Sequence, residues 1–233
     1  MSNSHRAPLL VLLFVLSSVS LFAQTPVDRW AKAVGGRERV AAIKAVYREA
    51  AIEVSGYKGI IKAWHTADGR YRKEEQVAMF SSVETFDGTN GMLQRGDAAP
   101  QTMAGADLER ARSTALANSN AMFFAFFPDR RRGARTVEDD GTIVLRPEGG
   151  IDWRVSLDPQ TSLPKTMTHK EGEKTITVDF VEFETVDGVR FEKEIHRSTG
   201  DPRFSAVIRF TKTVINPPID ASLFSIEAKK PSP

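Results

Sequence analysis

Three histidines, His65, His169 and His196, are the side chains of this chain best suited to proton transfer or metal binding near neutral pH. They lie far apart in the sequence and lack the spacing of a metal-binding motif. The chain has no cysteine and no serine in a Gly-x-Ser-x-Gly elbow, and Asp139-Asp140 is typical of a turn. We therefore expect no metal, no cofactor and no enzymatic activity. A hydrolase whose site is assembled from distant residues is the weaker alternative.

Aromatic side chains offer a different chemistry, the noncovalent burial of an apolar ligand. They are concentrated in Met122-Phe123-Phe124-Ala125-Phe126-Phe127. Burial of an acyl chain is worth about 0.8 kcal/mol per CH₂ group, so a protein that carries one needs apolar surface to cover it. These four rings cannot all face one direction on a single helix, so some of them are expected to line a second apolar surface. The simpler interpretation, which the pattern alone favours, is that the rings fill a core.

The predicted ligand-binding residues lie on this segment and on strand-like runs, where aromatic residues are interpreted as facing inward. The full set is Leu116, Met122, Phe123, Phe126, Phe127, Trp64, Trp153, Phe180 and Phe210. A basic run, Arg130-Arg131-Arg132 with Arg135, follows the aromatic segment directly. Its functional interpretation is docking to an acidic partner or to lipid headgroups, since arginine pairs well with phosphate. A solvated loop is the simpler interpretation.

These residues must be positioned by a scaffold that consists mostly of strands. Before it, Thr25-Pro26-Val27-Asp28 predicts the start of a short helix, because a hydroxyl caps the free N–H groups and proline fits the first helical position. Gly35-Gly36 ends this helix, and a second helical turn is expected around Arg37 to Ile43. From Lys44 the apolar period changes from helical spacing to two, which indicates a strand with one buried face.

Similar strand-like runs recur along the chain, separated by Asp-Gly pairs at 68–69, 87–88, 140–141 and 187–188, which favour tight turns. Consecutive strands are therefore expected to be hairpin neighbours in an antiparallel meander of roughly 10 strands, which would curl strongly or split. The predicted runs after the first strand are Ile60 to Thr66, Arg70 to Gln76, Val77 to Phe86, Met92 to Arg95, Thr142 to Arg146, Ile151 to Leu157, Lys165 to His169, Lys174 to Phe183, Val189 to His196 and Arg203 to Val214.

One helix interrupts this pattern, from Asp107 as a capping residue to Phe124. Its loose apolar stripe needs a partner, so the helix is expected to lie over a sheet face or an open barrel end. With the aromatic residues that follow, the segment from about Asp107 to Phe127 is predicted to form a helical lid.

Residues 1–23 have the three regions of a secretory signal peptide: a short polar start, the apolar run from Leu9 to Leu16, and small residues leading to Ala23, after which cleavage is expected. Residues 24–233 are predicted to form one domain. The absence of cysteine excludes an acylated cysteine anchor and disulfides. With 32 basic and 30 acidic residues, the charge balance gives no reason to expect nucleic acid as a partner.

Three turn-like motifs, with the Gly35-Gly36 opening, carry a resemblance to a known family: Phe86-Asp87-Gly88-Thr89-Asn90-Gly91, Asp158-Pro159-Gln160-Thr161-Ser162-Leu163-Pro164, and Asn216-Pro217-Pro218-Ile219-Asp220-Ala221-Ser222-Leu223-Phe224. From about Val27 to Phe224 the chain resembles the LolA-like proteins, the outer-membrane lipoprotein-sorting proteins and their periplasmic relatives. The resemblance implies a mainly β fold with a few helices, in which a strongly curved antiparallel sheet forms a half-open β-barrel with a helical lid.

The same resemblance implies a function. The expected activity is that of a periplasmic carrier, which binds the acyl chains of lipoproteins or other lipids in an apolar cavity and ferries them toward the outer membrane. Its expected partners are these acyl chains and the transport proteins of the inner and outer membranes, and the protein itself is not expected to be embedded in a membrane. The alternative is an envelope sensor or interaction module that uses the same scaffold without transport.

Overall fold

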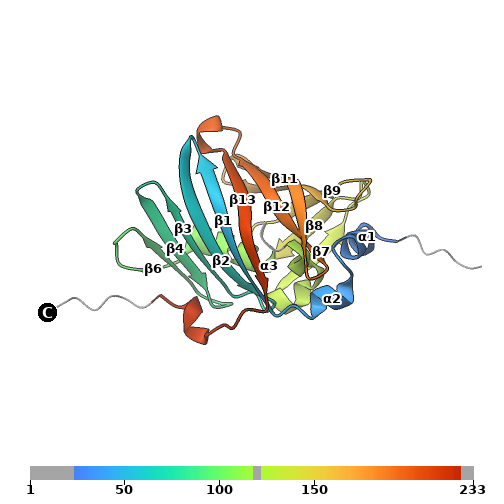
Figure 1. The fold of residues 1–233 in the computed structure, drawn as a ribbon, viewed down its shortest axis with the longest axis horizontal. Coiled ribbons are helices and arrows are strands. Elements are labelled where there is room, and N and C mark those ends of the chain that lie inside the picture. Colours follow the sequence, from blue (N-terminus) through green and yellow to red (C-terminus); the bar gives the residue numbers. More distant parts are fainter. Residues whose placement is uncertain (1–23, 118–121, 227–233) are drawn as a thin grey trace, which may run out of the picture.

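A computed structural model describes residues 24–117 and 122–226 of the chain. The predicted signal peptide, residues 1–23, lies outside these described residues. Within them, the strands form one antiparallel sheet that bends around the helical segments (Figure 1). The strands before the lid are β1 (Ala45–Val54), β2 (Tyr57–Thr66), β3 (Tyr71–Val77), β4 (Phe80–Phe86), β5 (Gly91–Arg95) and β6 (Gln101–Thr102). Those after it are β7 (Gly133–Val137), β8 (Ile143–Pro147), β9 (Trp153–Leu157), β10 (Pro164–Glu171), β11 (Lys174–Val186), β12 (Val189–Ser198) and β13 (Ala206–Ile215).

The strand order shows how the sheet is built from hairpins. It runs β6-β5-β4-β3-β2-β1-β13-β12-β11-β10-β9-β8-β7, so strands that follow one another in sequence pair with each other, and β13 joins the two halves by pairing with β1. The edge strands β6 and β7 do not pair with each other, so the sheet stays open. The predicted fold class, a curved antiparallel sheet forming a half-open barrel with a helical lid, is confirmed.

One predicted strand is split in the structure, and two short strands were not predicted. The run predicted from Val77 to Phe86 is split by a turn at Ala78, whose φ of 51° places a non-glycine residue in the left-handed region. No Gly, Pro or Asp marks that turn. The two strands that were not predicted are the edge strands β6 and β7. Both are short and most of their residues are exposed, so they lack a clear alternation of apolar and polar residues.

Two helices precede the sheet and cover part of its inner face. In α1 (Pro26–Ala33) the Thr25 hydroxyl accepts a hydrogen bond from the Asp28 N–H at 3.2 Å, as the capping pattern predicts. Trp30 on this helix is completely buried. After Gly35 and Gly36, both at positive φ, α2 (Arg37–Ala41) follows. The turn is fixed to the sheet because the Arg190 N–H donates to the Val34 carbonyl oxygen at 3.0 Å.

The lid connects the two edges of the sheet, since it lies between β6 and β7 in the sequence. It comprises α3 (Gly105–Leu116) and two 3₁₀ helices, η1 (Met122–Phe126) and η2 (Pro128–Arg131). The prediction of one helix from Asp107 to Phe124 is therefore wrong in extent. Ala104 is the residue that precedes α3, Asp107 lies in its first turn, and the helix ends at Leu116. The sequence after it, Asn118-Ser119-Asn120, consists of residue types that favour turns and caps over helix interiors.

The interior contains two apolar clusters. The larger one joins α1, α2 and η1 to the inner face of the sheet, the face that carries Val46, Ala50 and Ile52. The smaller cluster lies between α3 and the first half of the sheet, where Tyr71 and Phe86 pack against residues of the helix. The rings of η1 belong to the larger cluster, whereas α3 contributes to both clusters, because Leu116 lies in the larger one and Ala111 and Ala115 lie in the smaller one.

Two 3₁₀ turns complete the chain. One, η3 (Pro202–Phe204), precedes β13, where the sequence predicts that the strand begins at Arg203. The other, η4 (Ala221–Phe224), follows β13 and buries Phe224 beside the sheet. β13 ends at Ile215, just before the proline pair at 217–218, because proline cannot donate to a strand ladder.

Candidate functional site

The lid rings lie in the core. Phe123, Phe124 and Phe126 are 1–2% exposed. The ring of Phe126 packs edge-on against Trp30 with 4.6 Å between centroids, and Phe123 packs against Phe191 at 5.1 Å. In this structure the rings therefore fill the space beneath the lid, as the simpler interpretation of the aromatic run holds. A ligand could enter this space only by displacing them.

The other predicted residues of the lid differ in their surroundings. Leu116, the last residue of α3, is buried in the same cluster. Phe127 is half-buried, and the Arg130 guanidinium lies over its ring at 4.4 Å. The side chain of Met122 lies outside the described part of the chain.

Three of the four predicted strand aromatics face inward. Phe210, Phe180 and Trp153 belong to the larger apolar cluster and are 2–8% exposed. The ring of Trp153 stacks on His169 at 5.1 Å, and the Arg48 guanidinium lies 3.6 Å from the centroid of the Phe210 ring. A role for these residues in binding an acyl chain remains a prediction.

Trp64 does not face inward as predicted. It pairs across the ladder with Tyr47 and packs on its ring at 4.7 Å, whereas Val46 and Arg48, the neighbours of Tyr47 in β1, face the interior. Trp64 therefore lies on the outer face of the sheet. The sequence hides this orientation because β2 carries apolar residues on both faces near Trp64, so its alternation does not fix the buried side.

A buried ion pair, which the sequence analysis missed, lies in the middle of the inner face. Arg48 is 1% exposed and contacts the Glu192 carboxylate at 3.2 Å and Glu184 at 3.7 Å. Burial lowers the pKa of Arg48 to about 10, against the opposing effect of the two glutamates. The Thr213 hydroxyl accepts a further hydrogen bond from the Arg48 Nε at 3.1 Å. The only sequence signal for this site is a charged residue on the buried side of the first strand.

Toward the hairpin tips, the inner face becomes charged. Lys73 and Glu75 of β3 continue the rows of Ala63 and Ile61 on β2, so they face inward, and the Lys73 ammonium lies 3.2 Å from Glu75 and 3.8 Å from Glu84. Burial disfavours the charge on Lys73, but the two carboxylates outweigh it and raise its pKa. The inner surface is therefore not apolar throughout.

An apolar rim, formed by Tyr57, Val77, Met79 and Phe80, lies beside these charges at the hairpin tips. Met79 is 88% exposed, Phe80 76% and Tyr57 62%. Val77, Met79 and Phe80 also line an open hollow of about 410 Å³ together with Glu75 and Arg95. This rim is the most exposed apolar surface of the sheet, and the sequence analysis did not single it out.

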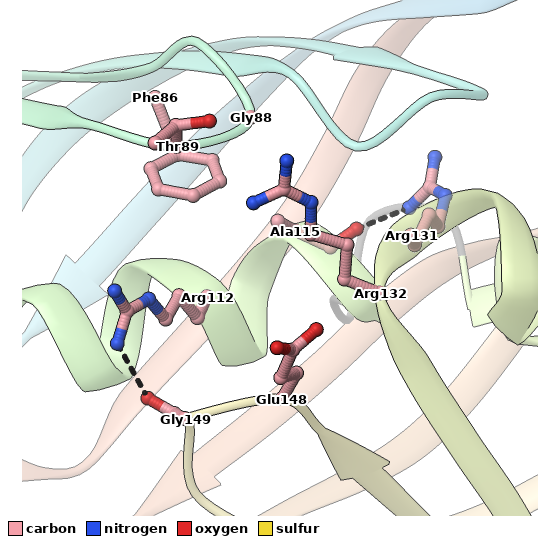
Figure 2. Close-up of a pocket in the computed structure, with 9 residues that line it drawn as sticks. All are labelled: Phe86, Gly88, Thr89, Arg112, Ala115, Arg131, Arg132, Glu148 and Gly149. Atoms are coloured by element: carbon pink, nitrogen blue, oxygen red, sulfur yellow. Dashed lines mark hydrogen bonds between the residues drawn. The ribbon is translucent and has the colours of Figure 1, made fainter.

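A second pocket, of about 180 Å³, lies at the opposite end of the sheet, between α3, the β4–β5 turn and the β8–β9 turn (Figure 2). Its polar lining comprises Thr89, Arg112, Arg131, Arg132 and Glu148. The basic run divides here. Arg131 is buried, whereas Arg130 and Arg132 are exposed. Neither the docking interpretation nor the solvated-loop interpretation anticipated a buried arginine in the middle of the run.

The three histidines do not come together. His65 is buried on the inner face, where burial and the nearby charges of Arg131 and Arg48 lower its pKa to about 3. The Nε2 of His169 lies 3.1 Å from Glu171, and that of His196 lies 2.7 Å from Glu194. Within residues 24–117 and 122–226, no group of three His, Asp or Glu side chains is placed to hold a metal ion. No helix of this part of the chain is long and apolar enough to cross a membrane.

Comparisons with known proteins identify the fold. No protein-family model matches the chain, and no curated protein matches its sequence. A solved structure of a DUF1329 family protein from Desulfovibrio piger is similar, with 12% sequence identity, a TM-score of 0.55, and coverage of 87% of this chain and 98% of that one. So is a LolA superfamily protein from Nitrosomonas europaea, with 7% identity, a TM-score of 0.54, and coverage of 88% and 99%. The chain therefore has a LolA-like fold.

Proposed function

We propose that this protein is a periplasmic carrier that binds the acyl chain of a lipoprotein or another lipid between the curved sheet and the lid, and ferries it toward the outer membrane. The LolA-like fold and the predicted signal peptide support this function. No catalytic step and no cofactor is part of it. The partners would be the acyl chain itself and the membrane proteins that deliver and receive it.

The observation that carries the proposal is the way in which the lid covers the sheet. The rings of η1 pack on the inner face, but η1 itself is not a strand of the sheet and lies in the sequence between the two edge strands, β6 and β7. The backbone of Ala125 is held by a hydrogen bond from Arg135 to its carbonyl oxygen at 2.9 Å. Within the described residues, η1 can therefore leave the inner face without breaking a strand pair.

The energies of the two states are comparable. Burial of one phenylalanine ring is worth about 1.5–3 kcal/mol, so three rings contribute on the order of 5–9 kcal/mol to the closed state. An acyl chain of roughly 16 carbons gains about 12 kcal/mol when it is fully buried. Exchange of the rings for an acyl chain is thus energetically feasible, and the filled interior represents the closed, ligand-free form. This replaces the expected preformed cavity with one that opens on binding.

A reversible cross-link tests whether the lid must move. The chain has no cysteine, and a Cβ added at Gly69 would lie 3.7 Å from the Cβ of Ala115, a separation that suits a disulfide. In the double variant Gly69→Cys/Ala115→Cys, oxidation would fix the end of α3 to the β2–β3 turn. We expect uptake of a fluorescent fatty acid to be slowed strongly by oxidation and restored by a reductant.

The controls separate lid movement from other effects. Ala115→Cys alone should respond to neither oxidant nor reductant, and the strain at Gly69, where φ is +93°, affects both redox states of the double variant equally. Trp64→Ala, on the outer face, should leave uptake unchanged. Uptake that is equally fast in the oxidised protein would show that α3 stays in place and that only η1 moves. A native protein that neither binds the probe nor contains acyl species by mass spectrometry would refute the carrier.

The apolar rim favours a second candidate function, an interaction module that senses envelope lipids or proteins without transport. An exposed cluster such as Met79 and Phe80 is typical of docking surfaces. Lipid transfer between donor and acceptor vesicles distinguishes the two functions. A carrier moves the lipid, whereas an interaction module binds one stable partner and moves none.

A further inference from the structure

The pocket of Figure 2 is lined by three arginines and a glutamate, which binding of an acyl chain does not require. It adjoins a second hollow of about 200 Å³, and the two share Gly88, Thr89, Arg131 and Arg132 in their linings. We call the two together the basic pocket. It borders the smaller apolar cluster, because Phe86 and Ala115 belong both to that cluster and to the lining of the pocket. Room for one water requires roughly 10–15 Å³, so the pocket is large enough for a small oxyanion and several waters.

Arg131 places a positive charge beneath this pocket, and it forms no ion pair with a carboxylate of residues 24–117 and 122–226. It is 5% exposed, and it donates to the carbonyl oxygens of Ala67 at 3.1 Å, Ala115 at 2.6 Å and Thr66. Its guanidinium lies 4.1 Å from the centroid of the Phe124 ring. Burial lowers the pKa of Arg131 to about 9, and the charge of Asp68 opposes this effect. The group therefore stays protonated at neutral pH and is compensated mainly by carbonyl dipoles.

Two further arginines carry donors that are not saturated. Arg132, which follows η2, has a φ of 52°, and its backbone donates to the Pro128 carbonyl oxygen and accepts from the Glu148 N–H at 2.8 Å. Its guanidinium forms no hydrogen bond or ion pair with the residues that the structure describes. In Figure 2 its guanidinium extends toward the β4–β5 turn that carries Gly88 and Thr89. Arg112 on α3 donates through Nη1 to the Gly149 carbonyl oxygen at 3.2 Å, which leaves its other N–H groups for a ligand.

The carboxylates that line the pocket are mostly engaged elsewhere. Asp68 forms an ion pair with Arg70 at 3.0 Å, and Asp87 accepts the backbone N–H groups of Thr89 and Asn90 at 2.8 and 2.7 Å. Glu148 forms no ion pair in the described residues, and it is exposed. The charge that the pocket presents to a ligand is therefore positive, and Glu148 is the carboxylate of its lining that neither an arginine nor a backbone N–H engages in the described residues.

We propose that the basic pocket binds a phosphate-type anion, a phosphate monoester or diester, held by the guanidinium groups of Arg112 and Arg132. A planar guanidinium matches two phosphate oxygens at once, and such charge-assisted pairs are the stronger class of hydrogen bond. Arg131 contributes its field from below, since its own donors are used by carbonyl groups. The bound anion would balance the positive charge of Arg131.

Calorimetric titration of the full mature chain with inorganic phosphate, at constant ionic strength, tests this site. We expect saturable binding that Arg132→Gln weakens about tenfold or more, as the loss of a hydrogen bond to a charged group predicts. Arg112→Gln should act in the same direction. Glu148→Gln should tighten binding, because it removes the opposing charge, and this gain is a result that general damage to the fold would not produce. Lys58→Gln, which removes the same charge at the other end of β2, is the matched control.

Two further probes identify the source of the anion. Glycerol phosphate represents a soluble ester, and vesicles of phosphatidylglycerol, compared with vesicles of phosphatidylcholine, represent a lipid headgroup. Binding to phosphatidylglycerol vesicles that Arg132→Gln abolishes assigns the pocket to a headgroup. Binding of phosphate or glycerol phosphate without vesicle binding assigns it to a soluble compound. The proposal is overturned if none of the three probes binds saturably, or if Arg132→Gln and Lys58→Gln reduce binding equally.

Discussion

Arg48 and Arg131 bring two guanidinium groups into the interior, and the chain compensates them in different ways. Arg48 has carboxylate partners on β11 and β12, whereas Arg131 has carbonyl groups and an aromatic ring. A buried ion pair adds little net stability relative to an apolar replacement, but the removal of one partner is costly because the other charge stays buried. The two residues therefore predict different responses to substitution.

The first prediction concerns the carboxylate partner of Arg48. Glu192→Gln should lower the free energy of unfolding by about 3 kcal/mol, since it removes the carboxylate that lies 3.2 Å from the buried Arg48, while Glu184 lies farther away at 3.7 Å. Glu194→Gln is the control, because Glu194 lies on the same strand but pairs with the exposed Arg209, and such pairs contribute about 1 kcal/mol or less. Chemical denaturation measures both. Equal losses would show that the Arg48 pair is not a buried charge pair in solution.

The second prediction concerns His65 and pH. Its pKa is lowered from 6.5 to about 3 by burial and by the charges of Arg131, Arg48 and Lys73. Between these values the unfolded chain binds a proton that the folded chain does not, so acid favours unfolding. The free energy of unfolding should therefore fall as the pH decreases below 6.5, by up to about 1.4 kcal/mol per pH unit.

The slope identifies the group responsible. His65→Asn should flatten the pH dependence between pH 6.5 and 4.5, whatever its effect on absolute stability. His169, whose pKa burial also lowers despite Glu171, contributes in the same direction, so part of the slope remains. A slope that His65→Asn leaves unchanged would mean that the folded protein can protonate His65 in this range.

At the scale of elements, the Gly35-Gly36 turn shows how two helices are fixed to the sheet. Both glycines have positive φ, at 120° and 96°, but only Gly35 lies against another backbone. A Cβ at Gly35 would collide with the carbonyl oxygen of Gly188 in the β11–β12 turn, whereas a Cβ at Gly36 meets nothing within 4 Å. This turn therefore docks α1 and α2 on a turn from the second half of the sheet.

The third prediction uses this difference. Gly36→Ala should cost about 1–3 kcal/mol, because its φ of 96° and ψ of 144° lie in a region that essentially only glycine adopts. Gly35→Ala should cost clearly more, because the same strain is joined by the collision with Gly188. Thermal or chemical denaturation of the two variants checks it, and each serves as the other's control. Similar losses would show that the two turns do not pack closely.

Most elements could be predicted from their sequence, because Asp-Gly turns and period-two alternation mark them directly. The lid could not be predicted in detail. An apolar run such as Phe123 to Phe126 is compatible with an α-helix by composition, and only tertiary packing against Trp30 and Phe191 selects a 3₁₀ turn. The outward orientation of Trp64 was missed for a related reason, since a large ring on a strand says little about which face is buried.

At the scale of the whole molecule, β13 makes the two halves of the sheet one structure. It pairs with β1 on one side and with β12 on the other, although β1 and β13 are at opposite ends of the described chain. The first half therefore lacks the partner of β1, and the second half lacks the partner of β12, until the chain up to Ile215 has folded. Long-range pairing of this kind is slow to form and favours cooperative unfolding.

The fourth prediction follows from this pairing of β13 with both β1 and β12. Native-state hydrogen exchange should give the most protected amides of β2 and β11 the same opening free energy and the same dependence on denaturant, because both report the global unfolding of one sheet. If β2 opened at lower free energy, and independently of β11, the two halves would be separate folding units joined by β13.

The charged and basic sites mark the limit of what the sequence could reveal at this scale. The polar lining of the basic pocket comes from α3, from η2 with the residue after it, and from the turns that follow β2, β4 and β8. These residues are spread along the sequence from Asp68 to Glu148. The spacing of these residues in the sequence does not indicate such a site. Only the run at 130–132 gave a signal, and it did not distinguish the buried Arg131 from its exposed neighbours.

The two unpaired edges of the sheet have a consequence for self-association. Strand edges with free N–H and C=O groups can recruit another chain, and proteins often limit this by keeping edge strands short. Here the edges are β6, of two residues, and β7, of five, while the longest strands lie inside the sheet. Two molecules that met edge to edge would gain few backbone hydrogen bonds. The short edge strands therefore protect this open sheet against the growth of fibrils.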